Sequence, residues 1–493
     1  MKEDNSKSEV EETLDPKDWK VLRGLGRRMI DDMFDYLQNI RSKQKLPLTE
    51  EAISEICVPL SDDGEGEAAV YEVFRRSILH YSLIITSPRL WGVVAGQGSP
   101  YGMLVEMLRA GMNGAQEFSF AEARVNKQVT SWIKELLGYS KESSCVLVSG
   151  GSEANFTGLA VARNVKAEVD VKTKGIQGMN RRMTLYCGDE THHCLERSVE
   201  LLGFGNEALR KIRTDDDCRI RIKDLETAIE EDREQNYHPF CVIGCAGTTN
   251  SGAFDDLEAL ADIAQQEDMW FHVDGAFGAW VRLSDTHRHL VEGMERADSL
   301  AVDFHKWMNM PYGIGCTLVR NQLAHFSTFV YGHDAEYLKS TFDLSEDKLT
   351  NPHNLALALS RNFSSLKVYM LLRAYGKKKY ASLIQQNLDQ INYLAELIER
   401  DDELVLTAPV ISNVVCFLFR PKGLDESEIE KLNRFILDEI NEKNFWMISD
   451  TTIKGKYMLR ACNVNHRTKR YDMDFLIHEV KEIGHKKLLK LQF

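Results

Sequence analysis

The sequence has 493 residues, of which 43% are hydrophobic and 28% charged, and its formal net charge at pH 7 is −14. These proportions are ordinary for a soluble globular protein, and the length allows two or three structural units with a large core. A nucleic-acid or anionic-membrane partner would require a basic face. The net negative charge therefore disfavours both kinds of partner, and we expect neither.

The cysteines and the N-terminal residues indicate the cellular compartment of the protein. No two of the ten cysteines have the Cys-x-x-Cys spacing of a zinc or redox site, and several lie in apolar runs. We therefore expect reduced core cysteines, a reducing compartment and no metal site. Residues 1–6 are polar and acidic, and no stretch approaches the roughly 18 apolar residues of a membrane span. These features predict a cytoplasmic protein.

The first part of the chain predicts a tail followed by a long helix. Residues 1–14 are typical of a disordered acidic tail. Asp15 and Pro16 offer a capping carboxylate and a proline at the first helical position. Apolar residues then recur every three or four positions from Leu22 to Ile40, which predicts one apolar stripe. This stripe would pack either on its own chain or on a partner, and the pattern leaves both open.

From about residue 100, short apolar strands alternate with helical stretches. Near-continuous apolar strands joined by helices predict a mostly parallel sheet covered on both faces, which binds ligands at the carboxyl ends of its strands. The strand candidates are 145–148, 183–187, 240–244, 270–273, 300–302 and 316–319. The polar stretch 331–353 suits a mobile lid. After about residue 376 we expect a smaller α/β unit, with strands at 413–418 and 457–460.

A turn of small residues, Ser149-Gly150-Gly151-Ser152, follows one strand candidate and opens a predicted helix. Small residues let backbone amides approach a phosphate closely, and a helix N-terminus adds favourable partial charge. Ser152 would add a hydroxyl donor. The Gly-Lys-Ser/Thr ending of a P-loop is missing. An ordinary tight turn would have the same pattern.

Two strand candidates end in ionisable residues that suit one cofactor. Asp274 ends the apolar run 270–273, so its carboxylate is expected to be partly buried and to need a partner. The protonated pyridinium nitrogen of pyridoxal phosphate is such a partner. Lys306 follows an apolar run as well. A partly desolvated lysine there is expected to have a lowered pKa and to attack the aldehyde of the cofactor as a nucleophile.

His192 and Thr249 also follow strand candidates closely. His192 precedes His193. The two side chains would be ordinary surface histidines or would bind a metal, although no further metal ligands occur at a suitable spacing. Alternatively, one imidazole would lie flat against a cofactor ring. Thr249 ends the run Gly247-Thr248-Thr249, whose hydroxyls would reach the phosphate or the ring, or would form a simple turn.

Taken together, these motifs resemble the group II pyridoxal-phosphate-dependent amino-acid decarboxylases, which include aromatic L-amino-acid, histidine and glutamate decarboxylases. The resemblance extends over roughly residues 16–475. It rests on five segments: 247–256, 272–276, 303–307, 361–367 and 459–460. It implies the α/β fold called fold type I, which is aspartate-aminotransferase-like, with a mostly parallel sheet and a smaller C-terminal α/β domain.

The resemblance also implies a role for individual residues. Lys306 would be the internal aldimine lysine, and Asp274 would pair with the pyridine nitrogen. Ala276 would lie beneath the cofactor ring and His192 above it. Gly151 and Ser152 would hold the phosphate, and Thr249 and His305 would lie nearby in the cofactor site.

The lid departs from the family pattern. Family decarboxylases carry a lid tyrosine that helps to protonate the α-carbon after carbon dioxide leaves. The aligned position falls near 351–353, which contains no tyrosine. His353 is a candidate donor because histidine suits this role near neutral pH, and Tyr331 or Tyr337 would serve if the lid were shifted. Loss of the donor would let oxygen quench the carbanion and give an aldehyde.

We therefore expect a lyase that decarboxylates an L-amino acid to its amine and carbon dioxide through Lys306. The alternatives are oxidative decarboxylation to an aldehyde, carbon–carbon lyase chemistry, or a non-catalytic binding module of the same fold. The segment 90–96, which lines the aromatic pocket in the family, is poor in aromatics at its inner positions, so the amino acid stays open.

The resemblance finally implies a homodimer with active sites at the interface. In the family, N-terminal helices wrap around the partner subunit. The predicted division is a tail at 1–14, an N-terminal helical segment at 15–99, a large cofactor-binding domain at 100–375 and a small domain at 376–493.

Overall fold

The computed structural model describes residues 12–44, 46–114, 120–330, 348–443 and 446–491, and it divides the chain into two compact units. The first unit ends at Leu83 and the second begins at Ile84. Within the first unit lie the helices α1 (Trp19–Gln38), α2 (Glu50–Ile56) and α3 (Glu67–Val73). The predicted domain boundaries at residues 14, 99 and 375 stay predictions.

Helix α1 begins three residues later than the proline at its predicted start. Asp18 is its N-cap, and the Asp18 carboxylate accepts hydrogen bonds from the amides of Lys20 and Val21. The prediction that Pro16 occupies the first helical position is therefore wrong, because a carboxylate closer to the helix satisfies the free amides of the first turn. No residue of α1 is buried within its own unit.

The second unit contains a seven-stranded sheet in the order β1-β7-β6-β5-β4-β2-β3. The neighbours from β3 through β2, β4 and β5 to β6 are parallel, whereas β7 is antiparallel to both β6 and β1. The prediction of a mostly parallel sheet is thus confirmed. The strands are β1 (Ser144–Val148), β2 (Met183–Gly188), β3 (Leu209–Ile212), β4 (His238–Cys245), β5 (Trp270–Asp274), β6 (Ser299–Asp303) and β7 (Gly315–Val319).

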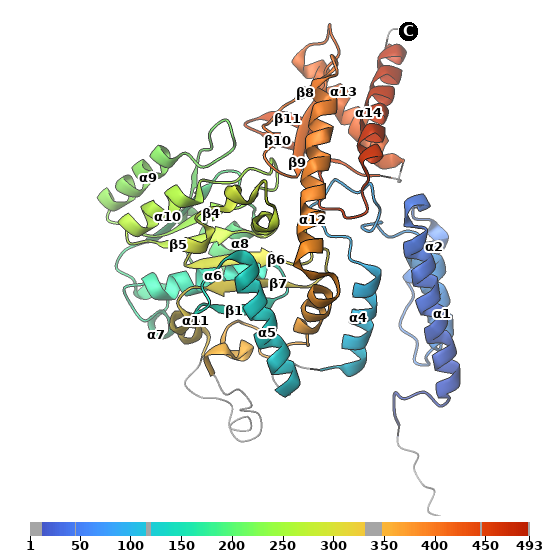
Figure 1. The fold of residues 1–493 in the computed structure, drawn as a ribbon, viewed down its shortest axis with the longest axis horizontal. Coiled ribbons are helices and arrows are strands. Elements are labelled where there is room, and N and C mark those ends of the chain that lie inside the picture. The colour runs from blue at the N-terminus through green and yellow to red at the C-terminus, as the bar shows by residue number, and fades with distance from the viewer. Residues whose placement is uncertain (1–11, 45, 115–119, 331–347, 444–445, 492–493) are drawn as a thin grey trace, which may run out of the picture. The chain divides into compact units, whose positions relative to one another are not determined.

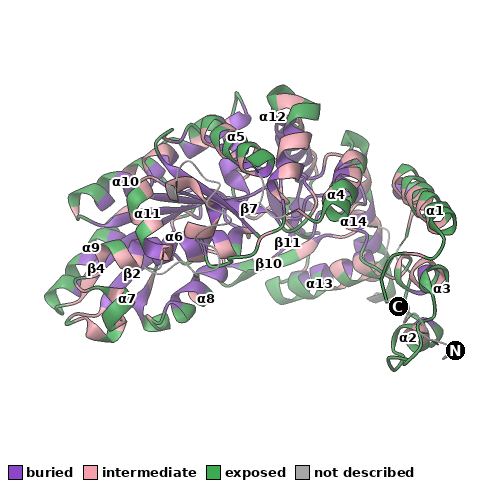
Figure 2. Ribbon diagram, turned by 90° about the horizontal axis from the view of Figure 1, so that it is seen from below, coloured by how far each residue is buried: buried purple, intermediate pink, exposed green. Residues whose placement is uncertain are grey.

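Helices cover both faces of this sheet (Figure 1). Along β2 and β4, successive apolar side chains belong to two different clusters: Leu185 and Ile243 pack with α6 and α8, while Tyr186 and Val242 pack with α5 and α10. Figure 2 shows the strands buried and the outward sides of α9 and α10 exposed. The helices are α4 (Pro100–Met112), α5 (Phe120–Leu137), α6 (Gly151–Lys166), α7 (Val171–Lys174), α8 (Cys194–Leu201), α9 (Ile222–Glu234), α10 (Leu257–Gln266) and α11 (Gln322–Phe329).

A smaller antiparallel sheet follows in the order β10-β11-β9-β8, as expected for a C-terminal α/β part. Its strands are β8 (Leu404–Leu406), β9 (Val414–Phe419), β10 (Ser449–Ile453) and β11 (Lys456–Cys462). The helices around it are α12 (Ser365–Glu399), α13 (Glu426–Glu442) and α14 (Arg470–Leu491). Helix α12 changes direction at Gly376, whose φ of 73° is left-handed.

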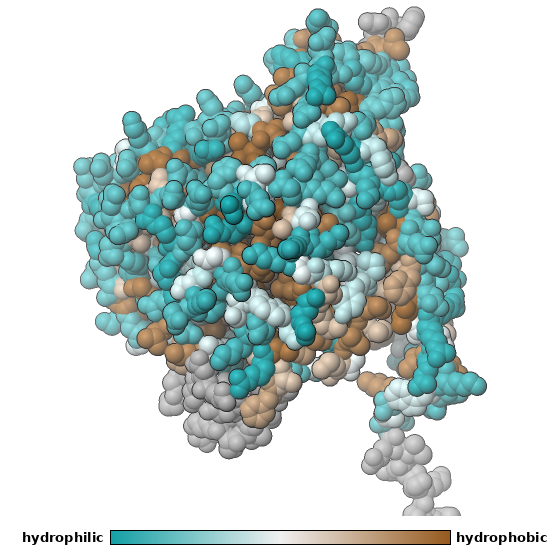
Figure 3. Space-filling model, viewed as in Figure 1, coloured by the Kyte–Doolittle hydropathy of each residue, from teal (hydrophilic) through white to brown (hydrophobic). Residues whose placement is uncertain are grey.

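Several further predictions bear on the surface and the cysteines. All ten cysteines are free, and only Cys57 is exposed. None of the described helices is both long enough and apolar enough to span a membrane. On the face shown in Figure 3, hydrophilic residues cover most of the described surface and hydrophobic ones form scattered groups. The predicted lid lies mostly outside the described residues, and so do Tyr331 and Tyr337.

Candidate active site

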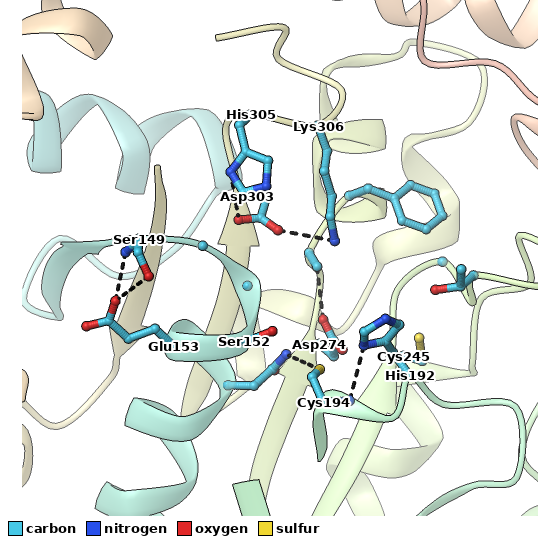
Figure 4. Close-up of a pocket in the computed structure, with 17 residues that line it drawn as sticks. Ser149, Ser152, Glu153, His192, Cys194, Cys245, Asp274, Asp303, His305 and Lys306 are labelled. Carbon is cyan, nitrogen blue, oxygen red and sulfur yellow. Dashed lines mark hydrogen bonds and ion pairs between the residues drawn. The ribbon is translucent and has the colours of Figure 1, made fainter. Parts of the chain in front are cut away.

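A cavity of about 390 Å³ lies where β4, β5 and β6 end and α6 begins (Figure 4). Because these strands are parallel, their carboxyl ends meet at one edge of the sheet, which is where such sheets bind ligands. The structure brings together eight residues that the sequence predicted for cofactor binding. They are Gly151, Ser152, His192, Thr249, Asp274, Ala276, His305 and Lys306.

Asp274 ends β5 and is only 5% exposed. One of its carboxylate oxygens, Oδ1, accepts a hydrogen bond from the amide of Ala276 over 3.1 Å. Among the described residues, no basic side chain forms an ion pair with this carboxylate. A buried charge without a cation is costly. The cavity is therefore suited to a ligand that brings a positive charge to this position.

Lys306 follows β6, and its Nζ lies 3.1 Å from Oδ2 of Asp303. Burial acts to lower the pKa of Lys306, but the carboxylates of Asp303 and Asp274 outweigh it, and the net pKa is raised. The prediction of a lowered pKa is thus wrong for the cofactor-free chain. Its physical reason is the Asp303 carboxylate, three residues earlier and in direct contact with the amine.

The turn that opens α6 brings backbone amides to the cavity. The first turn of a helix has amides without intrahelical acceptors, so they are available to an anion. A Cβ on Gly151 would lie 2.7 Å from Oδ2 of Asp303 and 3.2 Å from Cβ of Ala276, so only glycine leaves room there. The amide and hydroxyl of Ser149 both donate to Oε2 of Glu153, which fixes the start of the turn.

His192 lies between β2 and α8, on the side of the cavity opposite Lys306 (Figure 4). Its Nδ1 accepts a hydrogen bond from the amide of Cys194 over 3.2 Å. Burial first and then the neighbouring His193 lower the pKa of His192. The ring is therefore neutral near pH 7, with its hydrogen on Nε2, and presents a flat surface to the cavity.

His305 has a different set of contacts. Its Nδ1 lies 3.0 Å from the carbonyl oxygen of Ile314, and its ring stacks on Tyr312 with a centroid distance of 4.8 Å. Burial lowers the pKa of His305, against the opposing effects of Asp303 and the Ile314 carbonyl. A carbonyl only accepts, so Nδ1 carries the hydrogen and Nε2 remains an acceptor.

His353 does not line this cavity. It lies in the short 3₁₀ turn Pro352–Asn354, and its amide donates to Oδ1 of Asn351 over 3.1 Å. The side chain is half-buried. Its predicted role as a proton donor stays a prediction.

The cavity is also lined by residues that had no predicted role, among them Glu153, Cys194, Cys245 and Asp303. Asp303 had the same signal as Asp274, since it is a carboxylate that ends a wholly buried strand. Nothing in the sequence placed Cys194 or Cys245 beside Asp274. Burial raises the pKa of Cys194 to about 12, so its thiol stays neutral.

These features fit pyridoxal phosphate. Asp274 is a buried carboxylate that lacks a cation, the glycine turn leaves space and free amides for a phosphate, and Lys306 supplies an amine between them. The donor set therefore matches a ligand with an aldehyde, a basic ring nitrogen and a phosphate.

Residues 52–420 match the family model of the pyridoxal-dependent decarboxylase conserved domain, and the chain belongs to this family. It is 29% identical to an aromatic-L-amino-acid decarboxylase of Bacillus atrophaeus, over 94% of this chain and 95% of that protein. It is 28% identical to a phenylacetaldehyde synthase of Arabidopsis thaliana, over 91% of this chain and 92% of that protein.

A crystal structure of Oryza sativa TDC with PLP and tryptamine has the same fold, with a TM-score of 0.86 and 21% identity over 96% of this chain and 100% of that one. The predicted fold type I is therefore confirmed. This protein is a pyridoxal-phosphate-dependent amino-acid decarboxylase, a lyase, and pyridoxal phosphate is its cofactor.

Proposed function

We propose that this enzyme converts an L-amino acid into its amine and carbon dioxide, with Lys306 as the residue that holds the cofactor covalently. The observation that carries the proposal is that the carboxylate of Asp274, at the end of β5, and the amine of Lys306, in the turn after the neighbouring strand β6, point into one cavity (Figure 4). When bound, pyridoxal phosphate supplies the sink for the electrons that the departing carboxylate leaves behind.

Asp274, His192 and Ala276 orient the ring in this proposal. Asp274 holds a proton on the ring nitrogen, because its buried carboxylate gains a cation in this way. His192 is neutral and lies across the cavity, so it covers one face of the ring as a flat surface. Ala276 also lines the cavity, and its small side chain would leave room for the other face of the ring.

The phosphate is held at the N-terminus of α6. The free amides around Gly151 and Ser152 donate to it, and the Ser152 hydroxyl adds a further donor. Thr249 and His305 border the same space. Thr249 is held in turn by Arg460, whose Nε donates to its carbonyl oxygen over 2.9 Å.

We propose His353 as the group that gives a proton to the substrate α-carbon after carbon dioxide leaves. An imidazole suits this role near neutral pH. The second candidate function is oxidative decarboxylation to an aldehyde. Two observations favour considering it: residues 351–353 contain no tyrosine, and the Arabidopsis thaliana relative is a phenylacetaldehyde synthase.

One assay separates the two functions. Purified enzyme with pyridoxal phosphate is given a panel of L-amino acids, beginning with aromatic ones, since the Bacillus atrophaeus relative is an aromatic-L-amino-acid decarboxylase. Amine and carbon dioxide in equal amounts support the first function. Aldehyde, oxygen consumption and hydrogen peroxide support the second. The variant His353→Phe should shift the product ratio towards aldehyde, and no release of carbon dioxide from any amino acid would contradict both functions.

We also propose a cytoplasmic homodimer in which α1 contributes to the subunit interface. Several large apolar residues of α1 are exposed, among them Trp19, Val21, Met29 and Phe34. A surface of this kind is typical of a protein–protein contact. Sedimentation of the full chain and of a variant lacking residues 1–44 tests the proposal. The full chain should be dimeric and the shortened chain should dissociate, whereas a monomeric full chain would contradict it.

A further inference from the structure

Asp303 is the last residue of β6, and its carboxylate lies between Lys306 and the turn that opens α6 (Figure 4). The residue is 1% exposed. Its amide donates to the carbonyl of Ala276 over 2.9 Å, and its own carbonyl accepts from Nε1 of Trp280 over 2.7 Å. Both backbone groups of Asp303 are therefore held by hydrogen bonds, which fixes the position of its carboxylate in the cavity lining.

The two oxygens of this carboxylate have unequal surroundings. Oδ2 lies 3.1 Å from Nζ of Lys306. Oδ1 is buried and accepts no hydrogen bond from a described residue. Nδ1 of His305 is 3.6 Å from Oδ1 and directs its hydrogen to a carbonyl instead. Since His305 is neutral, Lys306 is the one cation that pairs with Asp303 in the described part of the chain.

The same carboxylate lies directly under the turn proposed to hold the phosphate. A Cβ on Gly150 would lie 3.4 Å from Oδ1, and a Cβ on Gly315 would lie 2.7 Å from the same atom. The close approach at Gly151 involves the other oxygen, Oδ2. A phosphate held by this turn is therefore a second anion beside a buried carboxylate. The phosphate and the Asp303 carboxylate repel each other, and only a charged Lys306 offsets this repulsion.

The other carboxylates of the cavity do not share this conflict. Glu153 accepts two hydrogen bonds from Ser149, at 2.8 and 2.6 Å. Asp274 gains the ring nitrogen as its partner when the cofactor binds. Asp303 instead loses its partner at that moment, because the amine of Lys306 is consumed. Removing one member of a buried ion pair leaves an uncompensated charge, which is destabilising.

We propose that Asp303 is the counter-ion of Lys306 in the cofactor-free enzyme. As a positioning residue, it holds the amine as an ammonium ion beside the turn proposed to bind the phosphate. It thereby slows capture, which is the covalent attachment of the cofactor to Lys306, and weakens the binding of a phosphorylated cofactor. The inference rests on the proposed role of Lys306. Capture requires the free amine: the ammonium proton leaves to solvent, the nitrogen lone pair bonds to the aldehyde carbon, and the aldehyde oxygen departs as water.

Several titratable groups face Lys306 besides Asp303, and each is left in place by a substitution at residue 303. They come from the loop after β2, the start of α8, the end of β5 and the loop after β6: His192, Cys194, Asp274, His305 and Tyr312. Asp303 is the carboxylate in direct contact with the amine, and it raises the pKa of Lys306 more than Asp274 does.

The test uses cofactor-free full-length protein and the variant Asp303→Asn, which keeps the shape of the side chain and removes its charge. Pyridoxal, which has no phosphate, is mixed with each protein, and the rate constant of capture is read from the absorbance change between pH 7 and pH 9. Loss of one neighbouring opposite charge shifts a pKa by about one unit or more, so capture should be about tenfold faster in the variant at each pH.

A second arm uses pyridoxal phosphate. The affinity of Asp303→Asn for it should rise by a larger factor than its affinity for pyridoxal, because the variant also removes the anion beside the phosphate. Asp232→Asn is the control: it removes a buried carboxylate that is paired with Arg210 and does not line the cavity. It should leave the capture rate of pyridoxal unchanged. Asp303→Ala should accelerate capture as Asp303→Asn does.

A capture rate in Asp303→Asn and Asp303→Ala that equals or falls below that of the wild type overturns the inference. The variant Lys306→Ala separates this failure from failure of the proposed function. If Lys306→Ala captures pyridoxal at the wild-type rate, the proposed role of Lys306 is wrong. If Lys306→Ala abolishes capture while both Asp303 variants leave the rate unchanged, only the counter-ion role of Asp303 is wrong.

Discussion

The amide of Gly96 donates a hydrogen bond to the carbonyl oxygen of His305 over 3.0 Å, which holds residue 96 against the backbone that carries Lys306. A Cβ on Gly96 would overlap the carbonyl oxygens of both His305 and Lys306. The segment predicted to shape the substrate pocket thus has a second effect: its glycine fixes the backbone position of the cofactor-binding lysine.

The substitution Gly96→Ala should therefore displace the backbone at Lys306. We expect a loss of about 1–3 kcal/mol in the free energy of unfolding, as for other insertions into a packed core, together with weaker cofactor binding. Urea unfolding and cofactor titration measure the two effects. Gly111→Ala in α4 is the control, because a Cβ there meets nothing within 4 Å. Unchanged stability and affinity in Gly96→Ala would show that the contact does not position Lys306.

Two substitutions at His192 distinguish the contribution of its flat ring to cofactor binding from that of its nitrogen atoms. His192→Phe keeps a flat ring, whereas His192→Ala removes it. If His192 covers the cofactor ring, the affinity for pyridoxal phosphate should fall about two- to tenfold in His192→Ala and stay close to wild type in His192→Phe, because stacked rings contribute about 0.5–1.5 kcal/mol. Equal losses of affinity in both variants would argue against stacking.

Asp274→Asn should lower the turnover number on the order of a hundredfold or more, because it removes the buried charge that keeps the ring nitrogen protonated. Capture of the cofactor by Lys306 should persist, since the amine is untouched. Steady-state rates and the absorbance of the bound cofactor are measured on the same sample. Wild-type turnover in this variant would remove Asp274 from the mechanism.

Acid should destabilise the folded chain between pH 6.5 and about 4. Burial lowers the pKa of His272 to about 4, and that of His466 to about 4 as well. In this window the unfolded chain binds protons that the folded chain does not, so the free energy of unfolding falls as the pH falls, by up to about 1.4 kcal/mol per pH unit for each group. Urea unfolding at pH 5, 6 and 7 measures the slope.

The substitution His272→Gln should reduce that slope by the contribution of one group. Burial keeps His272 neutral; in this form its Nε2 donates to Oδ1 of Asn155 over 2.8 Å and its Nδ1 accepts from the hydroxyl of Ser299 over 2.7 Å. His289 is exposed, and His289→Gln serves as the control. The same slope in His272→Gln and in the wild type would contradict this source of acid sensitivity.

The sequence allowed the main elements of the site to be predicted because each lies at the end of a buried strand. An apolar run that stops at Asp274, or just before Lys306, indicates both a buried strand and the polar residue at its carboxyl end. Parallel neighbours then bring those rims together. Three short strands were not predicted: β3 reads Leu-Arg-Lys-Ile, β8 reads Leu-Val-Leu, and β10 reads Ser-Asp-Thr-Thr-Ile. Polar residues interrupt β3 and β10, and β8 has only three residues.

The features that could not be predicted depend on contacts in the folded chain. The number of residues between two positions in the sequence does not determine whether their side chains touch. The raised pKa of Lys306 follows from the turn after β6, which folds the lysine back onto Asp303. The start of α1 depends on which of two aspartates caps it, and Asp18 does so. The position of His353 outside the cavity depends on the 3₁₀ turn 352–354.

The most direct test of the account is to locate the cofactor on the chain. The enzyme is loaded with pyridoxal phosphate, reduced with borohydride to fix the cofactor where it is attached, digested, and analysed by peptide mass spectrometry. The account predicts one modified residue, Lys306, and no fixed cofactor in Lys306→Ala. Cofactor fixed on another lysine of the wild type, or fixed to the same extent in Lys306→Ala, would contradict it.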